Sequence, residues 1–295
     1  MKVCAFGNSY MIAIKDAIED SDSSLNGSVT FAGCYAGSFS LSVAGDVVKP
    51  GPRFHLSFAE HKGPDILLSD YDAFLIVGLR FNFQHAAKIY AKHRLWQHAT
   101  ADHYIISEKA LESSIKDQLS LTIAVDLARS LRQQTDKPIF FIPQPNPSEA
   151  IKSMRLTTEQ LKELYERWQV LFEDEVGIEV YRSFVRAAEA VADDLFAKFL
   201  PQPADTMTPV FTDNSYRVEF KPKFEPNPDG AAVPPREGDI LHANPLFGHR
   251  VMKQIESLLT VASRAESTPP AFRAPRPLPI TLSSTWHPSF PEDVS

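Results

Sequence analysis

The sequence predicts an α/β fold, a three-layer α/β/α sandwich in which helices cover both faces of a central parallel sheet. Two observations predict it. Short, uniformly apolar runs alternate with longer helical patterns along the chain, and strands of that kind are typical of parallel sheets buried on both faces. The composition is that of an ordinary globular protein, with 43% hydrophobic and 23% charged residues, and 295 residues provide ample length for a sizeable core.

The expected strands are four short apolar runs, which occupy residues 3–6, 28–32, 73–77 and 139–142. The run at 73–77 is the clearest, because Asp72 precedes it and Gly78 follows it. The expected helices occupy residues 11–18, about 108–134, 157–172, 179–199 and 246–264. In the second of them, leucine or isoleucine recurs every four residues from Leu119 to Leu131, which places these side chains on one helix face.

Proline divides the chain into a body, an insertion and a tail. Eight of the 23 prolines lie in residues 201–238 and seven more in residues 269–291. Proline has no backbone donor and disfavours helix in the residue before it, so both stretches are expected to be mostly irregular. We therefore expect a single domain over 1–264, with 201–238 as an insertion that forms a wall or lid over the site, and a proline-rich tail over 265–295.

Charge and cysteine content argue against several classes of protein. The 30 basic and 37 acidic residues give a net charge of −7, so the basic footprint of a nucleic-acid binder is missing. No apolar stretch approaches the roughly 20 residues that cross a bilayer, and the run after Met1 is too short for a signal peptide. Two cysteines, Cys4 and Cys34, provide neither a disulfide framework nor a four-cysteine zinc site. We expect a cytoplasmic protein with no nucleic-acid or membrane partner.

No metal or organic cofactor is expected. Four histidines lie close together in sequence, but their spacing fits no single-face zinc site, so a solvated basic helix is the preferred interpretation: His85, His93, His98 and His103. The chain also lacks a P-loop and a Gly-x-Gly-x-x-Gly motif, which argues against a nucleotide enzyme.

Ser9 is the first candidate for chemistry. It follows the first expected strand, in Gly7-Asn8-Ser9, and stands at the entrance to a helix. Ligands of α/β sheets bind outside the carboxyl ends of the strands, and the positive end of a helix favours an oxyanion there. Serine is also a common helix N-cap, and on these residues alone the capping interpretation is preferred.

Asp239 and His242 change that preference. They stand three residues apart, just before the last expected helix. This spacing lets a carboxylate accept the Nδ1–H of the histidine and leave Nε2 facing outward as a base. A serine hydroxyl is a weak nucleophile without such a base. A surface Asp–His pair at a helix N-terminus is the alternative, but with Ser9 the three residues make a complete nucleophile, base and orienting acid.

Two blocks of this sequence resemble the SGNH hydrolases, also called GDSL esterases or lipases. The first family block, Gly-Asp-Ser, is similar to Gly7-Asn8-Ser9, with asparagine in place of aspartate. The last family block, Asp-x-x-His, is similar to Asp239-Ile-Leu-His242. The resemblance implies a flavodoxin-like sandwich of the SGNH hydrolase type, with Ser9, His242 and Asp239 in the catalytic triad.

The resemblance also implies an oxyanion hole, to which the backbone N–H groups of Ser9 and Gly37 contribute. The third family block, Gly-x-Asn-Asp after the third strand, supplies an asparagine side chain to this hole. Here the strand is followed by Gly78-Leu-Arg-Phe-Asn82, so Arg80 stands in the place of the asparagine. Either Arg80 or Asn82 is expected to donate, or the hole is incomplete, and loss of one donor typically costs about 100- to 1000-fold in rate.

We therefore expect a serine esterase, a hydrolase of carboxylic esters, that removes a small, acetyl-like acyl group from a carbohydrate. Its substrate is a small-molecule or glycan ester. Asn8 and Asn146, after the first and fourth strands, are the expected substrate-binding residues, although the prolines beside Asn146 equally indicate a rigid turn. Two alternatives stay open: a sugar O-acyltransferase with the same triad, and a non-catalytic binding protein on this fold.

Overall fold

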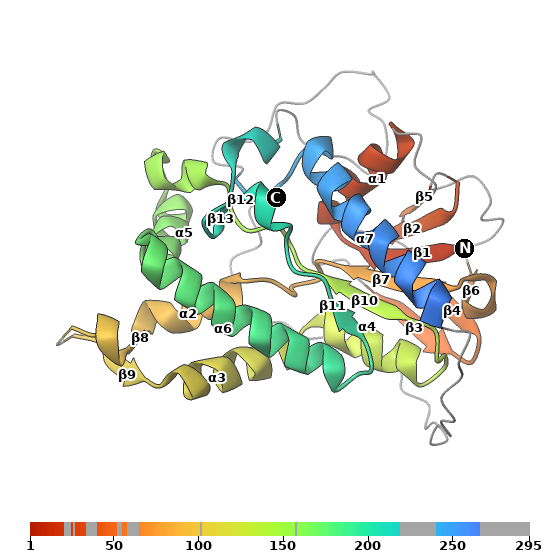
Figure 1. The fold of residues 1–295 in the computed structure, drawn as a ribbon, viewed down its shortest axis with the longest axis horizontal. Coiled ribbons are helices and arrows are strands. Elements are labelled where there is room, and N and C mark those ends of the chain that lie inside the picture. The colour runs from red at the N-terminus through yellow and green to blue at the C-terminus, as the bar shows by residue number, and fades with distance from the viewer. Residues whose placement is uncertain are drawn as a thin grey trace.

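Six strands form the central sheet, in the order β11-β10-β7-β1-β2-β5 (Figure 1). The computed structural model of the protein describes residues 1–20, 25, 27–33, 40–51, 55–57, 65–100, 102–156, 158–218 and 240–265. The strands of this sheet are β1 (Val3–Gly7), β2 (Val29–Gly33), β5 (His55–Ser57), β7 (Ala73–Val77), β10 (Ile139–Ile142) and β11 (Lys198–Phe199). Five of them run parallel and the edge strand β5 is antiparallel, so the predicted parallel sheet is confirmed.

The order of the strands locates the edge at which a ligand is expected. Counted along the chain, the five parallel strands lie in the order 2-1-3-4-5. The sheet thus grows from β1 towards β2, and then in the opposite direction through β7, β10 and β11. In such doubly wound sheets the ligand crevice lies outside the carboxyl ends of the two strands at which the direction reverses. Here these strands are β1 and β7, whose last residues, Gly7 and Val77, are register partners.

Helices cover both faces of the sheet, which confirms the three layers. Alternate strand residues enter two separate cores: Phe6 and Ile76 face one, and Ala5 and Leu75 face the other. The second core is closed by α1 (Ile12–Glu19) and α7 (Pro245–Ala265), and the first includes buried side chains of α4 (Ile123–Arg132). Figure 1 shows α1 and α7 in front of the sheet.

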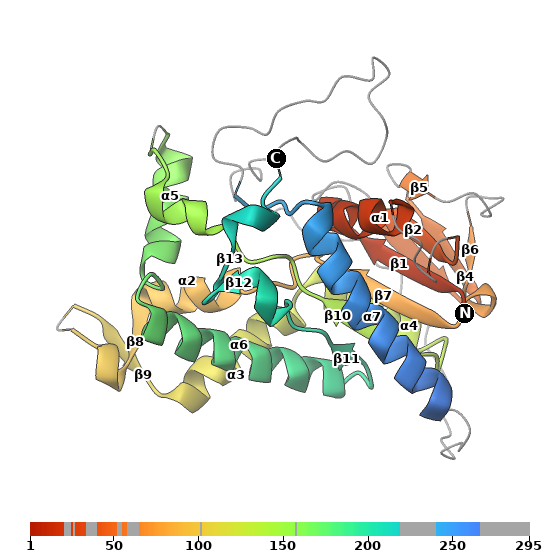
Figure 2. The same ribbon diagram turned by 45° about the horizontal axis from the view of Figure 1, so that its top comes forward.

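Four further helices lie together on the left of Figures 1 and 2. They are α2 (Gln84–Lys92), α3 (Glu108–Ser120), α5 (Glu159–Gln169) and α6 (Asp174–Asp193). Phe83, at the start of α2, joins three of these helices, because its ring lies 5.7 Å from that of Trp168 on α5 and 5.1 Å from that of Tyr181 on α6. Aromatic pairs at such distances add about 0.5–1.5 kcal/mol each beyond burial.

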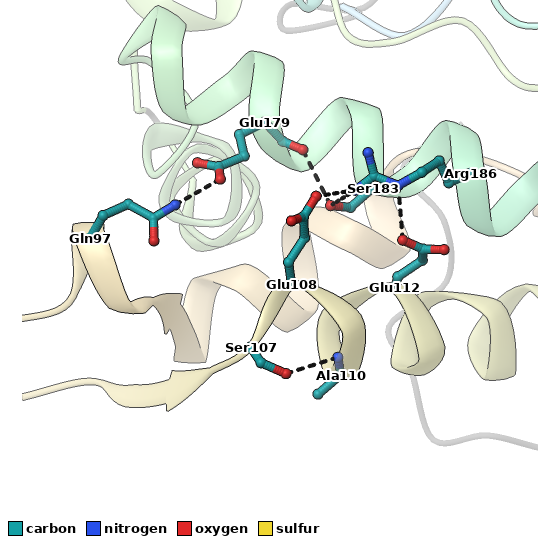
Figure 3. A network of polar contacts seen from close by, with 8 residues as sticks. All are labelled: Gln97, Ser107, Glu108, Ala110, Glu112, Glu179, Ser183 and Arg186. Carbon is teal, nitrogen blue, oxygen red and sulfur yellow. Dashed lines mark hydrogen bonds and ion pairs between the residues drawn. The ribbon is translucent and has the colours of Figure 1, made fainter.

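Polar contacts hold α3 against α6 (Figure 3). Arg186 on α6 reaches Glu108 and Glu112 on α3, with Nε 2.9 Å from Oε2 of Glu112. Ser107 caps α3 by accepting a hydrogen bond from the backbone N–H of Ala110 at 3.2 Å. Because the Arg186 side chain is 42% exposed, these ion pairs contribute little to stability, and they mainly fix how the two helices are aligned.

Three smaller sheets lie outside the central sheet in the described part of the chain. A three-stranded antiparallel sheet contains β3 (Leu41–Ala44), β4 (Val47–Pro50) and β6 (Ile66–Leu67), and the hairpin between its first two strands turns at Gly45, whose φ is +58°. Two-stranded sheets pair β8 (His93–Leu95) with β9 (Tyr104–Ile106), and β12 (Met207–Thr208) with β13 (Phe211–Thr212). The sequence analysis predicted none of these.

Two helix predictions are wrong in their bounds. The single helix expected over 108–134 is two helices, α3 and α4, because the backbone of Thr122 is extended and its hydroxyl donates to the carbonyl of Leu119 at 2.7 Å. Threonine side chains offer the backbone such alternatives to helical bonds. The helix expected over 179–199 is α6, which begins at Asp174 and ends at Asp193, before the short strand β11.

The expected insertion over 201–238 is structured in its first half. Val210 and Phe211 are buried, and the ring of Phe211 packs against those of Trp168 and Phe172. Through these side chains, residues 201–218 contribute to the core of the body. These residues pass beside His242, because Val218 N–H donates to the His242 carbonyl at 3.2 Å. Residues 219–239 and the tail 266–295 lie outside the described residues.

Among the helices that the structure describes, none combines the length and the apolar character needed to cross a membrane.

Gly248→Ala is expected to destabilise the fold, because α7 crosses α1 with no room for a side chain at this position. A Cβ built on Gly248 would lie 1.8 Å from the backbone oxygen of Ala13. Overpacking of this kind costs about 1–3 kcal/mol, which urea unfolding followed by circular dichroism would measure. Ser257→Ala, on the exposed side of α7, is the control and should leave the unfolding free energy unchanged. Equal unfolding curves for the two variants would contradict the close packing.

Candidate active site

Ser9 lies where β1 ends and the 3₁₀ turn η1 (Ser9–Met11) begins. Its hydroxyl does not cap the following helix, since neither η1 nor α1 has a side-chain cap. Instead, Ser9 Oγ lies 3.0 Å from Nε2 of His242, which is 233 residues away in sequence. The structure thus brings together the two residues that the sequence analysis expected as nucleophile and base, at the carboxyl edge of the sheet.

Several independent contacts hold the segment that carries His242. Before it, the carbonyl of Ile240 accepts a hydrogen bond from Ser148 N–H at 2.7 Å. After it, the side chain of Asn244 donates to the carbonyls of Ser215 and Arg217, and its Oδ1 accepts from Phe247 N–H at 3.2 Å. Asn244 therefore caps α7 and ties the end of the loop to residues 215–217. The backbone on both sides of His242 is therefore held, and with it the Cα from which the imidazole projects.

Tyr10 stacks on the imidazole of His242. The ring centroids are 5.0 Å apart and the planes meet at 16°. Because Tyr10 directly follows Ser9 in sequence, the turn that presents the hydroxyl also presents the ring that stacks on the His242 imidazole. The sequence analysis did not include Tyr10 in the site. The only available signal was an aromatic residue next to the serine, which is too common to indicate a function.

Two of the expected site residues, Asp239 and Gly37, lie outside the described residues. Asp239 as the orienting acid and the Gly37 N–H as an oxyanion donor therefore stay predictions.

The two candidates for the third oxyanion donor differ in their surroundings. The Asn82 amide is engaged within the protein, where Nδ2 donates to Oε1 of Gln144 and Oδ1 accepts from Gln84 N–H. Arg80 is exposed, and its guanidinium makes no ion pair in the described part of the chain. Asn82 thus acts in the structure as a link between the ends of β7 and β10, whereas the Arg80 side chain is open to solvent.

Asn8 and Asn146, the expected substrate-binding residues, are both buried. Asn146 is held on several sides: Nδ2 donates to the Val210 carbonyl at 2.7 Å, and its backbone N–H donates to Oε1 of Gln202 at 2.8 Å. Asn8 is 2% exposed, and its Oδ1 has no hydrogen-bond partner among the residues that the structure describes. This oxygen lies against the backbone of Gly78, where an added Cβ would come within 2.5 Å of it. A substrate-binding role stays a prediction for both residues.

The histidines after β7 have separate protein partners. His98 Nε2 lies 2.9 Å from a carboxylate oxygen of Glu179, His93 Nδ1 3.1 Å from the Ile89 carbonyl, and His103 Nδ1 2.6 Å from Thr100 Oγ1. In the parts of the chain that the structure describes, no three His, Cys, Asp or Glu side chains gather as a metal site would require.

Comparisons with protein-family models, with curated proteins and with solved structures gave no match for this chain. The resemblance to the SGNH hydrolases therefore depends on the sequence blocks alone.

Tyr10→Leu is expected to slow the reaction of Ser9 with an aryl phosphonate by roughly 2- to 10-fold, because the lost aromatic pair, worth about 0.5–1.5 kcal/mol, no longer fixes the imidazole. Tyr10→Phe keeps the ring and should react like the unchanged protein. The labelling rate, followed by intact mass, measures both variants. If Tyr10→Leu is labelled as fast as Tyr10→Phe, the stacked ring does not support the base.

His85 predicts a pH dependence of stability. Burial lowers the pKa of His85, and the nearby charges of Lys88 and Arg80 lower it further. The unfolded chain therefore takes up a proton at a higher pH than the folded one, so stability is retained above the unfolded pKa of about 6.5 and falls as the pH drops below it. His85→Gln, whose amide can still donate to the Arg80 carbonyl, should lose less stability between about pH 7.5 and 5.5. Urea midpoints at the two pH values measure this, and equal losses would contradict it.

Proposed function

We propose that this protein is a serine esterase of the SGNH hydrolase type, which removes a small, acetyl-like acyl group from a carbohydrate. One observation carries the proposal: Ser9 Oγ and His242 Nε2 lie 3.0 Å apart at the carboxyl edge of β1. A serine hydroxyl becomes a nucleophile when a base lies within hydrogen-bond reach. The edge where β1 meets β7 is also the edge at which doubly wound sheets bind their ligands.

In the proposed reaction, Ser9 Oγ attacks the carbonyl carbon of the ester while His242 Nε2 takes the hydroxyl proton. Asp239 is proposed to accept the Nδ1–H of the resulting imidazolium and to stabilise it. The tetrahedral intermediate collapses to an acyl-serine, and His242 returns the proton to the departing sugar hydroxyl. Water then attacks the acyl-serine with His242 as the base, which releases the acid and restores Ser9. These steps require no metal or organic cofactor.

The oxyanion that forms on the carbonyl oxygen needs donors already in place. The Ser9 N–H is available, since no hydrogen bond from it is found in the described part of the chain. Gly37 is the second proposed donor, on the basis of the family resemblance. The Asn82 amide is engaged by Gln144, so the proposed third donor is another group.

The substrate class follows from the family resemblance, in which small acyl groups on carbohydrates are frequent. The exposed guanidinium of Arg80, two residues after Gly78, would suit an acidic or phosphorylated glycan. We propose the cytoplasm as the compartment, where Cys4, which is buried and forms no disulfide, would stay reduced.

Two alternative functions can be distinguished from an esterase, one by the reaction product and the other by labelling of Ser9. A sugar O-acyltransferase would pass the acyl group from Ser9 to a sugar hydroxyl, so an added acceptor would yield an acylated sugar in place of free acid. A non-catalytic binding protein on this fold would not react at Ser9 with a phosphonate probe.

Ser9→Ala and His242→Ala are each expected to abolish hydrolysis of a small aryl acetate while the protein stays folded. The losses should exceed about 1000-fold, since the nucleophile and its base act as one unit. Release of 4-nitrophenol measures the rate, and circular dichroism verifies the fold.

His249→Ala is the matched control, because it removes a partly buried histidine of α7 while the histidine that is hydrogen-bonded to Ser9, His242, is kept. It should retain activity. Comparable turnover by Ser9→Ala and the unchanged protein would overturn the proposed mechanism.

A further inference from the structure

Three consecutive residues after β7 have left-handed backbone. The φ angles are +71° at Gly78, +51° at Leu79 and +68° at Arg80. Glycine adopts this region freely, but leucine and arginine do so rarely and at a cost. Non-glycine residues in such conformations cluster at functional sites, where the surrounding structure holds them. We call residues 78–80 the left-handed turn.

All three carbonyls of this turn are bonded, whereas of its N–H groups that of Gly78 is bonded, donating to the Ile142 carbonyl at 2.9 Å. The carbonyl of Gly78 accepts from Phe81 N–H at 2.9 Å, that of Leu79 from Ala124 N–H at 3.3 Å, and that of Arg80 lies 2.9 Å from Nε2 of His85. In the described part of the chain, by contrast, the N–H groups of Leu79 and Arg80 donate to nothing. Leu79 is only 2% exposed, and buried N–H groups without a partner are rare in proteins.

The left-handed turn lies beside Ser9. Gly7 and Val77 are register partners at the ends of β1 and β7, so residues 8–9 and 78–80 leave the sheet side by side. The contact between Asn8 Oδ1 and the backbone of Gly78 shows how closely the two segments approach. Successive backbone N–H groups in a turn form a concavity that binds anions.

We infer that the left-handed turn completes the oxyanion hole. The N–H groups of Leu79 and Arg80 take the place of the asparagine side chain that the third SGNH block would supply, and they act together with the N–H of Ser9. This inference rests on the proposed function. The ligand group is the anionic oxygen of a tetrahedral acyl or phosphonyl centre on Ser9.

The inference assigns different roles to the backbone and the side chain of Arg80. Its N–H binds the oxyanion, whereas its guanidinium stays in solvent and is not needed for a neutral ester. Asn8 Oδ1 is an acceptor and gives no hydrogen bond to an anion. A half-turn of that amide would present Nδ2 as a further donor instead.

A structure of the phosphonate adduct tests the inference directly. Ser9 Oγ bonds to phosphorus as 4-nitrophenolate leaves and the serine proton passes to His242, which gives a stable mimic of the tetrahedral intermediate. We expect a phosphonyl oxygen about 2.7–3.1 Å from the nitrogen of Leu79 or Arg80. An oxygen bound only to other groups, such as the Arg80 guanidinium or the Asn82 amide, would overturn the inference.

Two variants at position 80 test it by rate. Arg80→Gly removes the side chain but adopts a positive φ easily, so its rate on neutral 4-nitrophenyl acetate should fall at least about tenfold less than that of Arg80→Val. Arg80→Val also removes the charge, but its branched Cβ disfavours a positive φ, and we expect a loss of about 100-fold. Equal large losses in both variants would assign the donor to the guanidinium, and unchanged rates in both would show that the turn is not used.

The same experiments distinguish a failure of the oxyanion-hole inference from a failure of the proposed esterase mechanism. If Ser9 is not labelled by the phosphonate and Ser9→Ala keeps its activity, the esterase mechanism fails. If Ser9 is labelled and required but the adduct oxygen avoids Leu79 and Arg80, the mechanism stands and only the left-handed turn is overturned. Should Arg80→Val fail to fold, the adduct structure of the unchanged protein still decides.

Discussion

The parallel pairing of β1 with β7 is the constraint on which the candidate site depends. Both strands are buried, and they end in register at Gly7 and Val77. The backbones approach so closely there that a Cβ on Gly7 would lie 2.8 Å from the Val77 carbonyl oxygen. Any larger residue would push the strand ends apart, and with them the Ser9 turn and the left-handed turn. Because the strand order reverses between β1 and β7, this is the edge at which sheets of this kind bind their ligands.

His242 reaches this edge from the other end of the described chain. His242 depends on the loop contacts of residues 215–218 and on the docking of α7 against α1, where Gly248 lets the two helices meet. Ser9 and His242 are 233 residues apart in sequence, so their 3.0 Å contact exists only when the sheet, α1 and α7 have all formed. A change in the packing of α7 on α1 would therefore affect the site through the position of the His242 imidazole.

How much the sequence could predict depends on the range of the interactions. The strands at 73–77 and 139–142 were predicted with correct bounds, because uniform apolar runs between turn residues are a local signal. The residue pair Ser9 and His242 was predicted from short motifs, which are local as well. The burial of Phe211 was not predicted, because its neighbours Trp168 and Phe172 meet it only in the fold. The edge strand β5 and the stacking of Tyr10 on His242 have the same long-range origin.

The break between α3 and α4 and the left-handed turn are two parts of one feature. In a continuous helix, Ala124 N–H would bond to the carbonyl four residues earlier. Because the chain is extended at Thr122, this N–H is instead free to donate to the carbonyl of Leu79. Left-handed backbone costs about 1–2 kcal/mol for each of the two non-glycine residues, and each backbone hydrogen bond contributes about 0.5–1.5 kcal/mol. The bonds that tie the turn's carbonyls to Phe81, Ala124 and His85 are therefore of the right size to offset its strain. The helix break, which no local pattern indicated, is thus part of what holds residues 78–80 beside Ser9.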